Sequence, residues 1–509
     1  MSHYAQTEAW WPASYPIQQR PDKNEEVKEI PPEKQEEPLE LPTSIPAVQD
    51  SHKHAPGART IVVCLDGTGD KFDGDNSNVV DFVTCLKKDD PYQVTYYQSG
   101  IGTYDSKGLS SGISAAMDMA VGSSLGVHVK DAYRFLMQTY REGDRICLFG
   151  FSRGAYTVRC LAGMLHKVGL LPPHNKTQVQ FAYQIYKDNT EEGWQMSNDF
   201  KKTFCMNVNV YFVGVWDCVA SVGFIPRTLP LSSTRTSWIQ HFRHAISLDE
   251  RRAKFKVCRW QQDSLDNCDD EESGYVHKLH QLKKKTRRKR KIEEHHVPND
   301  VLEVWFAGCH ADVGGGAVVN EERHKLSRIP LRWMIRQCFE CNTGIIFDTT
   351  ALAETGLDVH KVWPVYIKPT VPSLGPSPDM LEKYFADKLP PIHRRSSALG
   401  LGTREQIDQL EAETLIPEQY EDYFDSRAPI NDQLKLAKGW WMLEFWPIGL
   451  RREVKPGIWQ KYVGWNLGQH RVVRDADPKL HWTVERRMIE MGYKIRNKMA
   501  SYATWEICA

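Results

Sequence analysis

The sequence predicts a doubly wound α/β fold with a mostly parallel sheet and a helical, aromatic-rich C-terminal cap. Between residues 58 and 342, continuous apolar runs of strand length alternate with helical patterns, which is typical of a parallel sheet covered by helices on both faces. After residue 343, proline-rich stretches and clustered tryptophans replace this alternation. Residues 1–57 are rich in proline, glutamate, glutamine and lysine and are expected to form a disordered tail. We therefore predict three parts, with the boundaries 1–57, 58–342 and 343–509.

The overall composition argues against several classes of function. The 509 residues contain 65 basic and 65 acidic side chains, so no global field favours nucleic acid as a partner. The N-terminus lacks a basic region followed by an apolar run, and no apolar stretch of about 18 residues occurs. The sequence therefore predicts neither a standard secretory signal nor a transmembrane helix. The 12 cysteines are scattered, which favours reduced thiols in a cytoplasmic protein over a disulfide framework.

The strongest motif is Gly-Phe-Ser-Arg-Gly at residues 150–154, where an apolar strand pattern ends and a helical pattern begins. Strand, Gly-x-Ser-x-Gly and helix in this order are typical of the nucleophile elbow of α/β-hydrolases. Ser152 would lie on a sharp, strained turn, and the flanking glycines would let strand and helix approach closely. The alternative is a Gly-Ser turn that merely joins two elements.

The first predicted strand, Arg59–Leu65, runs into an Asp-Gly-Thr-Gly-Asp turn. Gly67 or Thr68 in this turn could lend a backbone N–H to an oxyanion hole, together with the N–H of Arg153 at the start of the elbow helix. A tight turn in which the first aspartate caps the next helix is equally compatible with the pattern.

The segment from residue 76 to the elbow contains three further predicted elements. A helix is expected over residues 76–86, a strand over 93–98 and an amphipathic helix over 127–140. The glycine- and serine-rich segment at 100–124 is interpreted either as a lid over the serine or as an ordinary surface loop.

Two later strands end in candidate catalytic groups. The strand predicted over residues 207–216 is followed at once by Asp217, and the strand over 301–308 is followed by Cys309 and His310. Alone, either side chain could simply cap or bond its own loop. Ser152, Asp217 and His310 nevertheless follow three strands in the chain order of α/β-hydrolases, so the carboxyl ends of the strands would bring them together. His310 would take the proton of Ser152, and Asp217 would orient and stabilise the charged imidazole.

Between these two strands the pattern is less regular. Residues 236–255 are expected to begin as a helix, and residues 261–300 as a charged loop insertion. The basic run Lys283–Lys291 in this insertion is favoured as a solvated loop, with a nuclear localisation signal or a contact with anionic lipid as alternatives. His244 is a rival base, but it falls in the helical pattern near acidic residues. Asp312 is a rival acid, but it lies on the same loop as His310.

The C-terminal part offers fewer signals. A helix is predicted over residues 329–338, and the pair Cys338 and Cys341 is interpreted as buried side chains because no second pair accompanies it. Neither a metal ion nor a cofactor is predicted. A dense aromatic block at 439–447 either packs a cap onto the core or forms a surface that contacts lipid, and periodicity does not separate the two.

Six ordered motifs resemble the α/β-hydrolase domain family of formerly unknown function that includes the phospholipase effectors of bacterial type VI secretion and has many fungal members. They are Leu65-Asp-Gly-Thr-Gly-Asp70, Gln98-Ser-Gly-Ile-Gly-Thr103, Gly150-Phe-Ser-Arg-Gly-Ala-Tyr156, Val215-Trp-Asp217 followed by Val219-Ala-Ser221, His244-Ala-Ile-Ser-Leu-Asp-Glu-Arg-Arg252 and His310-Ala-Asp-Val-Gly-Gly-Gly316. The resemblance covers about residues 58–340. It implies a Ser152, Asp217 and His310 triad and the hydrolysis of lipid or other carboxylic esters. Asp70 departs from the pattern, because relatives often carry asparagine there.

The sequence therefore predicts a serine-dependent carboxylic ester hydrolase, lipase-like or phospholipase-like, whose substrate is a small-molecule or lipid ester. Peripheral contact with a membrane is left open, and no oligomeric state is predicted. The alternatives are a non-catalytic interaction protein that keeps the fold, and a thioesterase or peptidase on the same scaffold. The expected location is cytoplasmic, with entry into the nucleus through the basic run as a variant.

Overall fold

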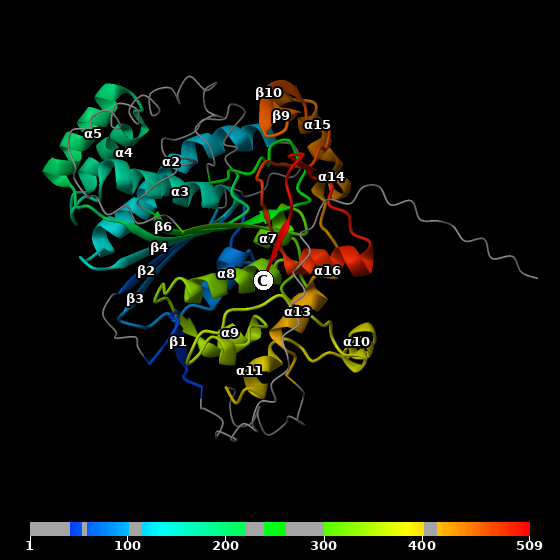
Figure 1. Ribbon diagram of the computed structural model, residues 1–509. Helices are drawn as coiled ribbons and strands as arrows, with labels where there is room; N and C mark the ends of the chain where they lie inside the picture. Colours follow the sequence, from blue (N-terminus) through cyan, green and yellow to red (C-terminus); the bar gives the residue numbers. More distant parts are fainter. Residues whose placement is uncertain (1–40, 53–58, 101–113, 220–238, 261–299, 402–414) are drawn as a thin grey trace, which may run out of the picture.

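A parallel sheet runs through the centre of the molecule (Figure 1). The computed structural model describes residues 41–52, 59–100, 114–219, 239–260, 300–401 and 415–509. Within these residues, eight strands pair in parallel throughout. In spatial order they are β14 (Glu506–Cys508), β12 (Lys479–His481), β7 (Asp300–Phe306), β6 (Ile239–Ser247), β5 (Val210–Trp216), β4 (Arg145–Phe151), β2 (Thr60–Leu65) and β3 (Gln93–Gln98).

Helices cover both faces of this sheet, which explains the continuous apolar runs of its central strands. Alternate side chains of β2 enter two different cores: Ile61 and Val63 enter the first, and Val62 and Cys64 enter the second. The first core is covered by α2 (Ser114–Thr139), α3 (Ser152–Val168), α4 (Val179–Lys187) and α5 (Glu191–Phe204). The second is covered by α1 (Asn78–Thr84), α8 (Arg328–Glu340) and α9 (Thr349–Glu354).

Most predicted elements of the α/β part are present. Strand β3 has the predicted bounds, and β2 begins at Thr60, one residue later than predicted. Helix α2 begins at Ser114 and not at the predicted residue 127, so its start was predicted much too late. The other predicted elements, apart from the helix discussed next, differ by a few residues at their ends. The glycine- and serine-rich segment is helical from Ser114 onward, as the start of α2, and its residues 101–113 lie outside the described residues. Helix α5 was not predicted, although its signal is present: Thr190 caps it by accepting the N–H of Gly193.

The helix predicted at the start of residues 236–255 is wrong. Residues Ile239–Ser247 form strand β6, which lies between β5 and β7. Polar side chains interrupt its apolar run, and they are paired across the sheet: the Nδ1–H of His244 donates to Glu303 Oε1 at 2.8 Å, and Arg243 donates to Asp300 Oδ2 at 2.5 Å. Because these partners come from the neighbouring strand, the buried strand resembled an amphipathic helix in the sequence.

The part of the chain that the structure describes includes a strand before the predicted end of the tail. Strand β1 (Ser44–Pro46) pairs antiparallel with β8 (Ile346–Asp348), and Ile45 is buried in the second core. The boundary at residue 57 is therefore too late. Residues 1–40 and 53–58, and the part 261–299 of the predicted charged insertion with its basic run, lie outside the described residues.

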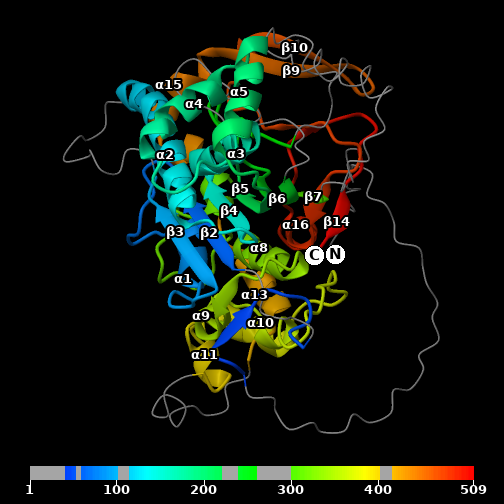
Figure 2. The same ribbon diagram turned by 90° about the vertical axis from the view of Figure 1, so that its left-hand side faces the viewer.

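The C-terminal part is more than a helical cap, because it also extends the central sheet. Strand β12 pairs with β7, and β14 pairs with β12, so two strands from the last 31 residues continue the sheet beyond the α/β part. Figure 2 shows β14 beside α16 (Trp482–Met491). The other elements of the C-terminal part are α10 (Pro378–Phe385), α11 (Arg394–Ala398), α13 (Glu418–Asp425), α14 (Gln433–Leu436), α15 (Trp441–Glu444), the antiparallel hairpin of β9 (Pro447–Lys455) and β10 (Ile458–Trp465), α16 (Trp482–Met491), and the pair β11 (Val472–Val473) and β13 (Lys498–Met499).

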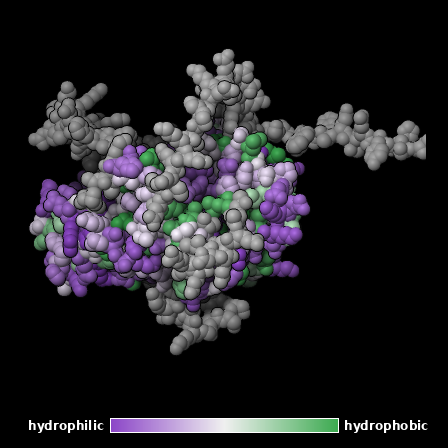
Figure 3. Space-filling view, turned by 90° about the horizontal axis from the view of Figure 1, so that it is seen from below, coloured by the Kyte–Doolittle hydropathy of each residue, from purple (hydrophilic) through white to green (hydrophobic). Residues whose placement is uncertain are grey.

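The described helices include none that is long and apolar enough to cross a membrane. Seen from below, the surface is mixed: hydrophilic residues gather toward the two sides, and a narrower hydrophobic area lies between them (Figure 3).

Candidate active site

The backbone at Ser152 has the geometry predicted for a nucleophile elbow. Ser152 is the first residue of α3, directly after β4, and has a φ of 57°, in the left-handed region that non-glycine residues rarely occupy. A Cβ at Gly154 would lie 2.2 Å from the carbonyl oxygen of Leu65, and one at Gly150 would lie 2.7 Å from the amide nitrogen of Ala155. Glycine is therefore required on both sides, because the start of α3 packs against the ends of β2 and β4.

The structure brings the three predicted triad residues together. The Oγ–H of Ser152 donates to His310 Nε2 at 2.7 Å, and the Nδ1–H of His310 donates to Asp217 Oδ2 at 2.5 Å. The carboxylate fixes this tautomer, since only an Nδ1–H can bond to it. All three side chains are buried. They follow β4, β5 and β7, as expected for residues at the carboxyl edge of one parallel sheet.

The electrostatics of the pair His310 and Asp217 suit proton transfer. Burial alone would raise the pKa of Asp217, but the guanidinium of Arg471 and the hydrogen bond from His310 hold it well below its usual range. Burial lowers the pKa of His310 below its ordinary value, and the Asp217 carboxylate opposes this shift. The imidazole is therefore neutral near pH 7 and able to accept a proton, beside a carboxylate that stays ionised.

The rival base has a structural role. Both ring nitrogens of His244 are engaged: Nδ1–H donates to Glu303 Oε1 at 2.8 Å, and Nε2 accepts the N–H of Cys218 at 3.1 Å. His244 therefore holds the turn that follows Asp217.

The rival acid also supports a loop. Asp312 accepts the backbone N–H of Asn431 at 2.9 Å and its side-chain Nδ2–H at 2.7 Å. It also accepts the N–H of Cys309 at 2.8 Å. Asp312 thus fixes the start of the short helix α7 (His310–Gly314), which carries His310, and it bonds this helix to the C-terminal part.

The predicted oxyanion donors are not equivalent. The N–H of Gly67 donates to Asp66 Oδ1 at 2.8 Å, so Gly67 is already engaged and the prediction needs correction there. The Oγ1 of Thr68 is buried and has no hydrogen-bond partner among the described residues. The N–H of Arg153 belongs to the first turn of α3, at the positive end of the helix. Thr68 and Arg153 remain the candidate donors.

The Asp-Gly-Thr-Gly-Asp turn lies against the elbow. A Cβ at Gly67 would lie 2.9 Å from the ring of Phe151, the residue before Ser152. Burial, and then the nearby Asp66, raise the pKa of Asp70 to about 8, while Arg153 opposes the shift. Asp70 is therefore mostly protonated at neutral pH, in the uncharged state that an asparagine would also have.

Sequence reasoning missed the main partner of the triad acid. Arg471 NH1 donates to Asp217 Oδ1 at 2.5 Å, and NH2 donates to Oδ2 at 2.9 Å. The two residues are 254 positions apart, and no local pattern connects them. The N–H of Ser247 donates to Asp217 Oδ1 at 2.9 Å, so each carboxylate oxygen accepts at least two hydrogen bonds.

Aromatic rings enclose the histidine. The rings of Phe151 and Phe255 lie 4.6 and 4.8 Å from the His310 ring, and Trp440 packs edge-on against Phe255 at 5.5 Å. The guanidinium of Arg252 lies over the Phe255 ring at 3.5 Å. The C-terminal aromatic block therefore reaches the site through Trp440, and it helps to keep water away from the imidazole.

One group of residues has the donor atoms of a metal site. His241, Asp300 and Cys341 offer ligand atoms within 4.8 Å of one another. However, Arg243 donates to both Asp300 Oδ2 at 2.5 Å and Cys341 Sγ at 2.9 Å. A guanidinium thus already neutralises this cluster, which argues against a metal ion.

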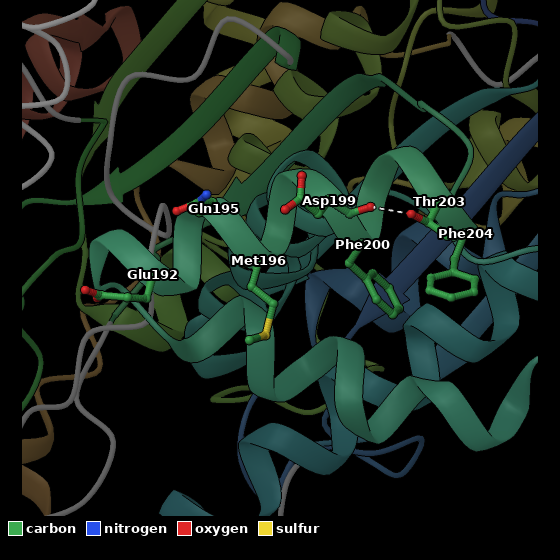
Figure 4. Close-up of a pocket in the computed structure, with 7 residues that line it drawn as sticks. All are labelled: Glu192, Gln195, Met196, Asp199, Phe200, Thr203 and Phe204. Atoms are coloured by element: carbon green, nitrogen blue, oxygen red, sulfur yellow. Dashed lines mark hydrogen bonds between the residues drawn. The ribbon is translucent and has the colours of Figure 1, made fainter.

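A pocket on α5 is separate from the triad. Figure 4 shows its side chains along one helix, with the Oγ1–H of Thr203 donating to the carbonyl of Asp199 at 2.8 Å. It is open to solvent and lined by Glu192, Gln195, Met196, Asp199, Phe200, Thr203 and Phe204. No triad residue contributes to it.

A family comparison covers the part of the chain that carries the triad. The family described as "T6SS, Phospholipase effector Tle1-like, catalytic domain" matches residues 59–337, which is more than half of the chain. The protein belongs to this family. Its α/β part is thus a Tle1-like, phospholipase-like catalytic domain, and the Tle1-like match ends 134 positions before Arg471.

Individual relatives of this Tle1-like protein are distant. It is 27% identical over 546 residues to the uncharacterized protein YEL023C of Saccharomyces cerevisiae, covering 85% of this chain and 79% of the yeast protein. Two solved structures are similar at lower levels. An uncharacterized protein from Pseudomonas aeruginosa is 14% identical, with a TM-score of 0.32, and the match covers 78% of this chain and 69% of that one. The Tle1 effector bound to the VgrG spike of the type 6 secretion system is 16% identical, with a TM-score of 0.26 and coverage of 51% and 52%.

Proposed function

We propose that this Tle1-like protein is a serine-dependent carboxylic ester hydrolase that acts on lipid esters of the phospholipid type. The observation that carries the proposal is the continuous hydrogen-bond chain from Ser152 through His310 to Asp217, with distances of 2.7 and 2.5 Å. A protein that had kept only the fold would have no need of this chain, so the geometry argues against a purely non-catalytic role.

The proposed reaction proceeds through an acyl enzyme. Ser152 Oγ attacks the ester carbonyl carbon while His310 Nε2 takes the hydroxyl proton, and the carbonyl oxygen becomes an oxyanion. His310 then gives this proton to the leaving alcohol as the ester bond breaks. Water attacks the acyl enzyme, His310 again takes a proton, and the carboxylic acid leaves with Ser152 restored.

Donors from the start of α3 and from the Asp-Gly-Thr-Gly-Asp turn are proposed to hold the oxyanion. Arg153 N–H at the start of α3 and Thr68, through its N–H or its buried Oγ1–H, are the candidate donors. The N–H of Gly67 would join them only by leaving Asp66 Oδ1.

An exposed apolar surface supports a lipid substrate. The β9–β10 hairpin and the residues beside it expose large apolar side chains, namely Met442, Phe445, Trp446, Val454, Ile458, Val463, Trp465 and Leu467. Basic residues lie among them at Arg451, Arg452, Lys455 and Lys461. Apolar side chains interleaved with cations suit the interface of an anionic lipid bilayer. We call this hairpin and its exposed residues the hairpin surface; Figures 1 and 2 place the hairpin at one end of the molecule.

The hairpin surface is connected to the site. Glu444, at the end of α15, is buried and accepts the N–H of Ala253 at 2.6 Å, two residues before Phe255. Trp440 packs on the same Phe255 ring, which contacts His310. A lipid held at the hairpin surface would therefore lie near the loop that borders the imidazole.

The test compares a soluble ester with a lipid surface. We expect the purified wild type to release p-nitrophenol from short-chain esters and fatty acid from vesicles of phosphatidylcholine with phosphatidylserine, and Ser152→Ala to do neither. Equal turnover by the wild type and Ser152→Ala would contradict the proposal. Hydrolysis of acyl thioesters or peptides alone would assign the same triad to the thioesterase or peptidase alternative.

A further inference from the structure

The acid of the triad is held by a residue from outside the family domain. Arg471 is buried, and beyond its two bonds to Asp217 its guanidinium donates to Ser247 Oγ at 2.7 Å and to the carbonyl of Phe255 at 2.6 and 3.1 Å. The Tle1-like match ends at residue 337. The carboxylate of the catalytic domain thus has its counter-ion in the C-terminal part of the chain.

The arrangement of these bonds fixes the orientation of the carboxylate. A planar guanidinium that bonds to both oxygens of a carboxylate holds the two groups in one plane. Asp217 Oδ2 accepts from Arg471 and also from His310 Nδ1, so turning the carboxylate would break both contacts at once. Asp217 also has a φ of 38°, a left-handed backbone conformation that needs support from its surroundings.

Arg471 is itself held in place by the end of the chain. Its carbonyl accepts the Nδ2–H of Asn497 at 3.0 Å, and the next residue, Val472, pairs with Lys498 in the β11–β13 ladder. Figure 1 draws the red C-terminal elements beside α7 (His310–Gly314), and Figure 2 draws them beside β7, with which β12 pairs. The position of the guanidinium is therefore determined by the packing of residues 471–509 on the catalytic domain.

We propose that Arg471 is a positioning residue for catalysis, which fixes the Asp217 carboxylate so that Oδ2 faces the Nδ1–H of His310, and that the C-terminal part thereby completes the active site of the catalytic domain. This inference rests on the proposed function. It assigns to Arg471 no contact with the substrate, since it acts through Asp217.

The charge of Arg471 and its geometry have opposite effects on His310. A fixed carboxylate improves proton transfer, because it holds the imidazole in the productive tautomer and orientation. The positive charge, however, partly cancels the stabilisation that Asp217 gives to the imidazolium. The other charged groups that face His310 are Glu250, whose Oε2 accepts the His310 N–H at 3.3 Å, and Arg252. Removal of the Arg471 charge should therefore raise the pKa of His310.

The test separates charge from geometry with two variants and one control. Arg471→Gln removes both the charge and the bidentate contact. Arg471→Lys keeps the charge but cannot bond to both carboxylate oxygens in the planar, bidentate way of a guanidinium. Arg395→Gln is the matched control, because Arg395 is buried in the same C-terminal part, pairs with Glu421 and makes no contact with the triad. Ester hydrolysis is measured from pH 5 to 9, with thermal unfolding of each variant in parallel.

The expected result is specific to the triad. Arg471→Gln should lower kcat by about 100-fold, the scale of a misplaced catalytic group, and move the acidic limb of the profile to higher pH. Arg471→Lys should show the acidic limb at the same pH as the wild type, and its kcat should lie between those of Arg471→Gln and the wild type. Arg395→Gln should be less stable than the wild type, with the acidic limb at the same pH. If Arg471→Gln keeps the wild-type limb and loses no more kcat than Arg395→Gln, the role is structural and the inference is wrong.

A second readout needs no substrate. The Nδ1 proton of His310, bonded to a carboxylate, should give a low-field resonance in ¹⁵N-histidine-labelled protein. That resonance should weaken or move in Arg471→Gln and stay unchanged in Arg395→Gln; an unchanged resonance in Arg471→Gln contradicts the inference. Because this signal is independent of turnover, a wild type that hydrolyses no ester would overturn the proposed function and leave this inference separately testable.

Discussion

The replacement Asp217→Asn should damage both catalysis and stability, for reasons that follow from the four hydrogen bonds at this side chain. One amide oxygen can still accept from Arg471 and from the N–H of Ser247. The amide nitrogen then takes the place of Oδ2, where it faces two donors, Arg471 NH2 at 2.9 Å and His310 Nδ1–H at 2.5 Å. The imidazole is driven into the other tautomer, which cannot accept the proton of Ser152. We expect kcat to fall by about 10⁴-fold.

The cost in stability comes from a buried cation without its counter-ion. Removal of one partner of a buried ion pair lowers the free energy of unfolding by about 3–5 kcal/mol. Because the amide oxygen of asparagine still accepts from Arg471, we expect a loss of about 3 kcal/mol for Asp217→Asn. An unfolding entropy of about 2.1 cal/mol/K per residue gives about 1 kcal/mol/K for the whole chain. Dividing the loss in free energy by this entropy predicts that Tm falls by about 3 °C. The double variant Asp217→Asn/Arg471→Met removes the unpaired charge and should be more stable than the sum of the single changes by about 2 kcal/mol.

The assay is a double-mutant cycle. Unfolding of the wild type, the two single variants and the double variant is followed by near-ultraviolet circular dichroism in urea, and ester hydrolysis is measured on the same samples. The double variant should regain stability but no activity. Additive losses, or an Asp217→Asn variant that keeps more than a tenth of kcat, would refute the reasoning that a charge-paired, oriented carboxylate is needed here.

Three further predictions concern protonation and the lipid surface. Because burial lowers the pKa of His310, the acidic limb of kcat/KM should lie below pH 6.5, and a limb above pH 7 would contradict this. The pKa of Asp70 is raised to about 8, so ionisation of this carboxyl should destabilise the folded wild type as the pH rises from about 4 to about 8. Asp70→Asn cannot ionise. The Tm of this variant relative to the wild type should therefore increase between pH 5 and 8, with no further increase at pH 9. Val463→Glu on the hairpin surface should lower vesicle hydrolysis several-fold and leave soluble esters unaffected, whereas Leu374→Glu, equally exposed but on the loop before α10, should change neither.

The turn at Ser152 and the placement of Ser152, Asp217 and His310 beside one another could be predicted from the sequence, because each rests on a local pattern. Their catalytic roles stay a prediction. A mostly apolar strand is visible in a short window of sequence. Ser152 and Asp217 follow such strands directly, and His310 follows the end of β7 after three intervening residues. The rule that parallel strands present their carboxyl ends at one edge then supplies the proximity that distances along the chain do not. The cytoplasmic location remains a prediction from composition.

The features that could not be predicted from the sequence depend on pairing between residues that are far apart along the chain. Strand β6 resembled a helix because the partners of its polar residues lie on β7, 59 positions away in the case of His244 and Glu303. Strands β12 and β14 have three residues each, too few for a periodic signal. β7 supplies the edge with which β12 pairs, and β12 supplies the edge for β14. Arg471 has no local feature that distinguishes it from other arginines, and only the folded chain brings it to Asp217.

The central claim is that Ser152 is a nucleophile activated by His310, and covalent labelling tests it most directly. The full-length protein is treated with a fluorophosphonate, and intact mass and peptide mapping locate the adduct. The wild type should gain one phosphonyl group on the peptide that contains Ser152, His310→Ala should react far more slowly, and Ser152→Ala should gain none. Equal labelling of the wild type and Ser152→Ala, or an adduct on a different residue, would contradict the account.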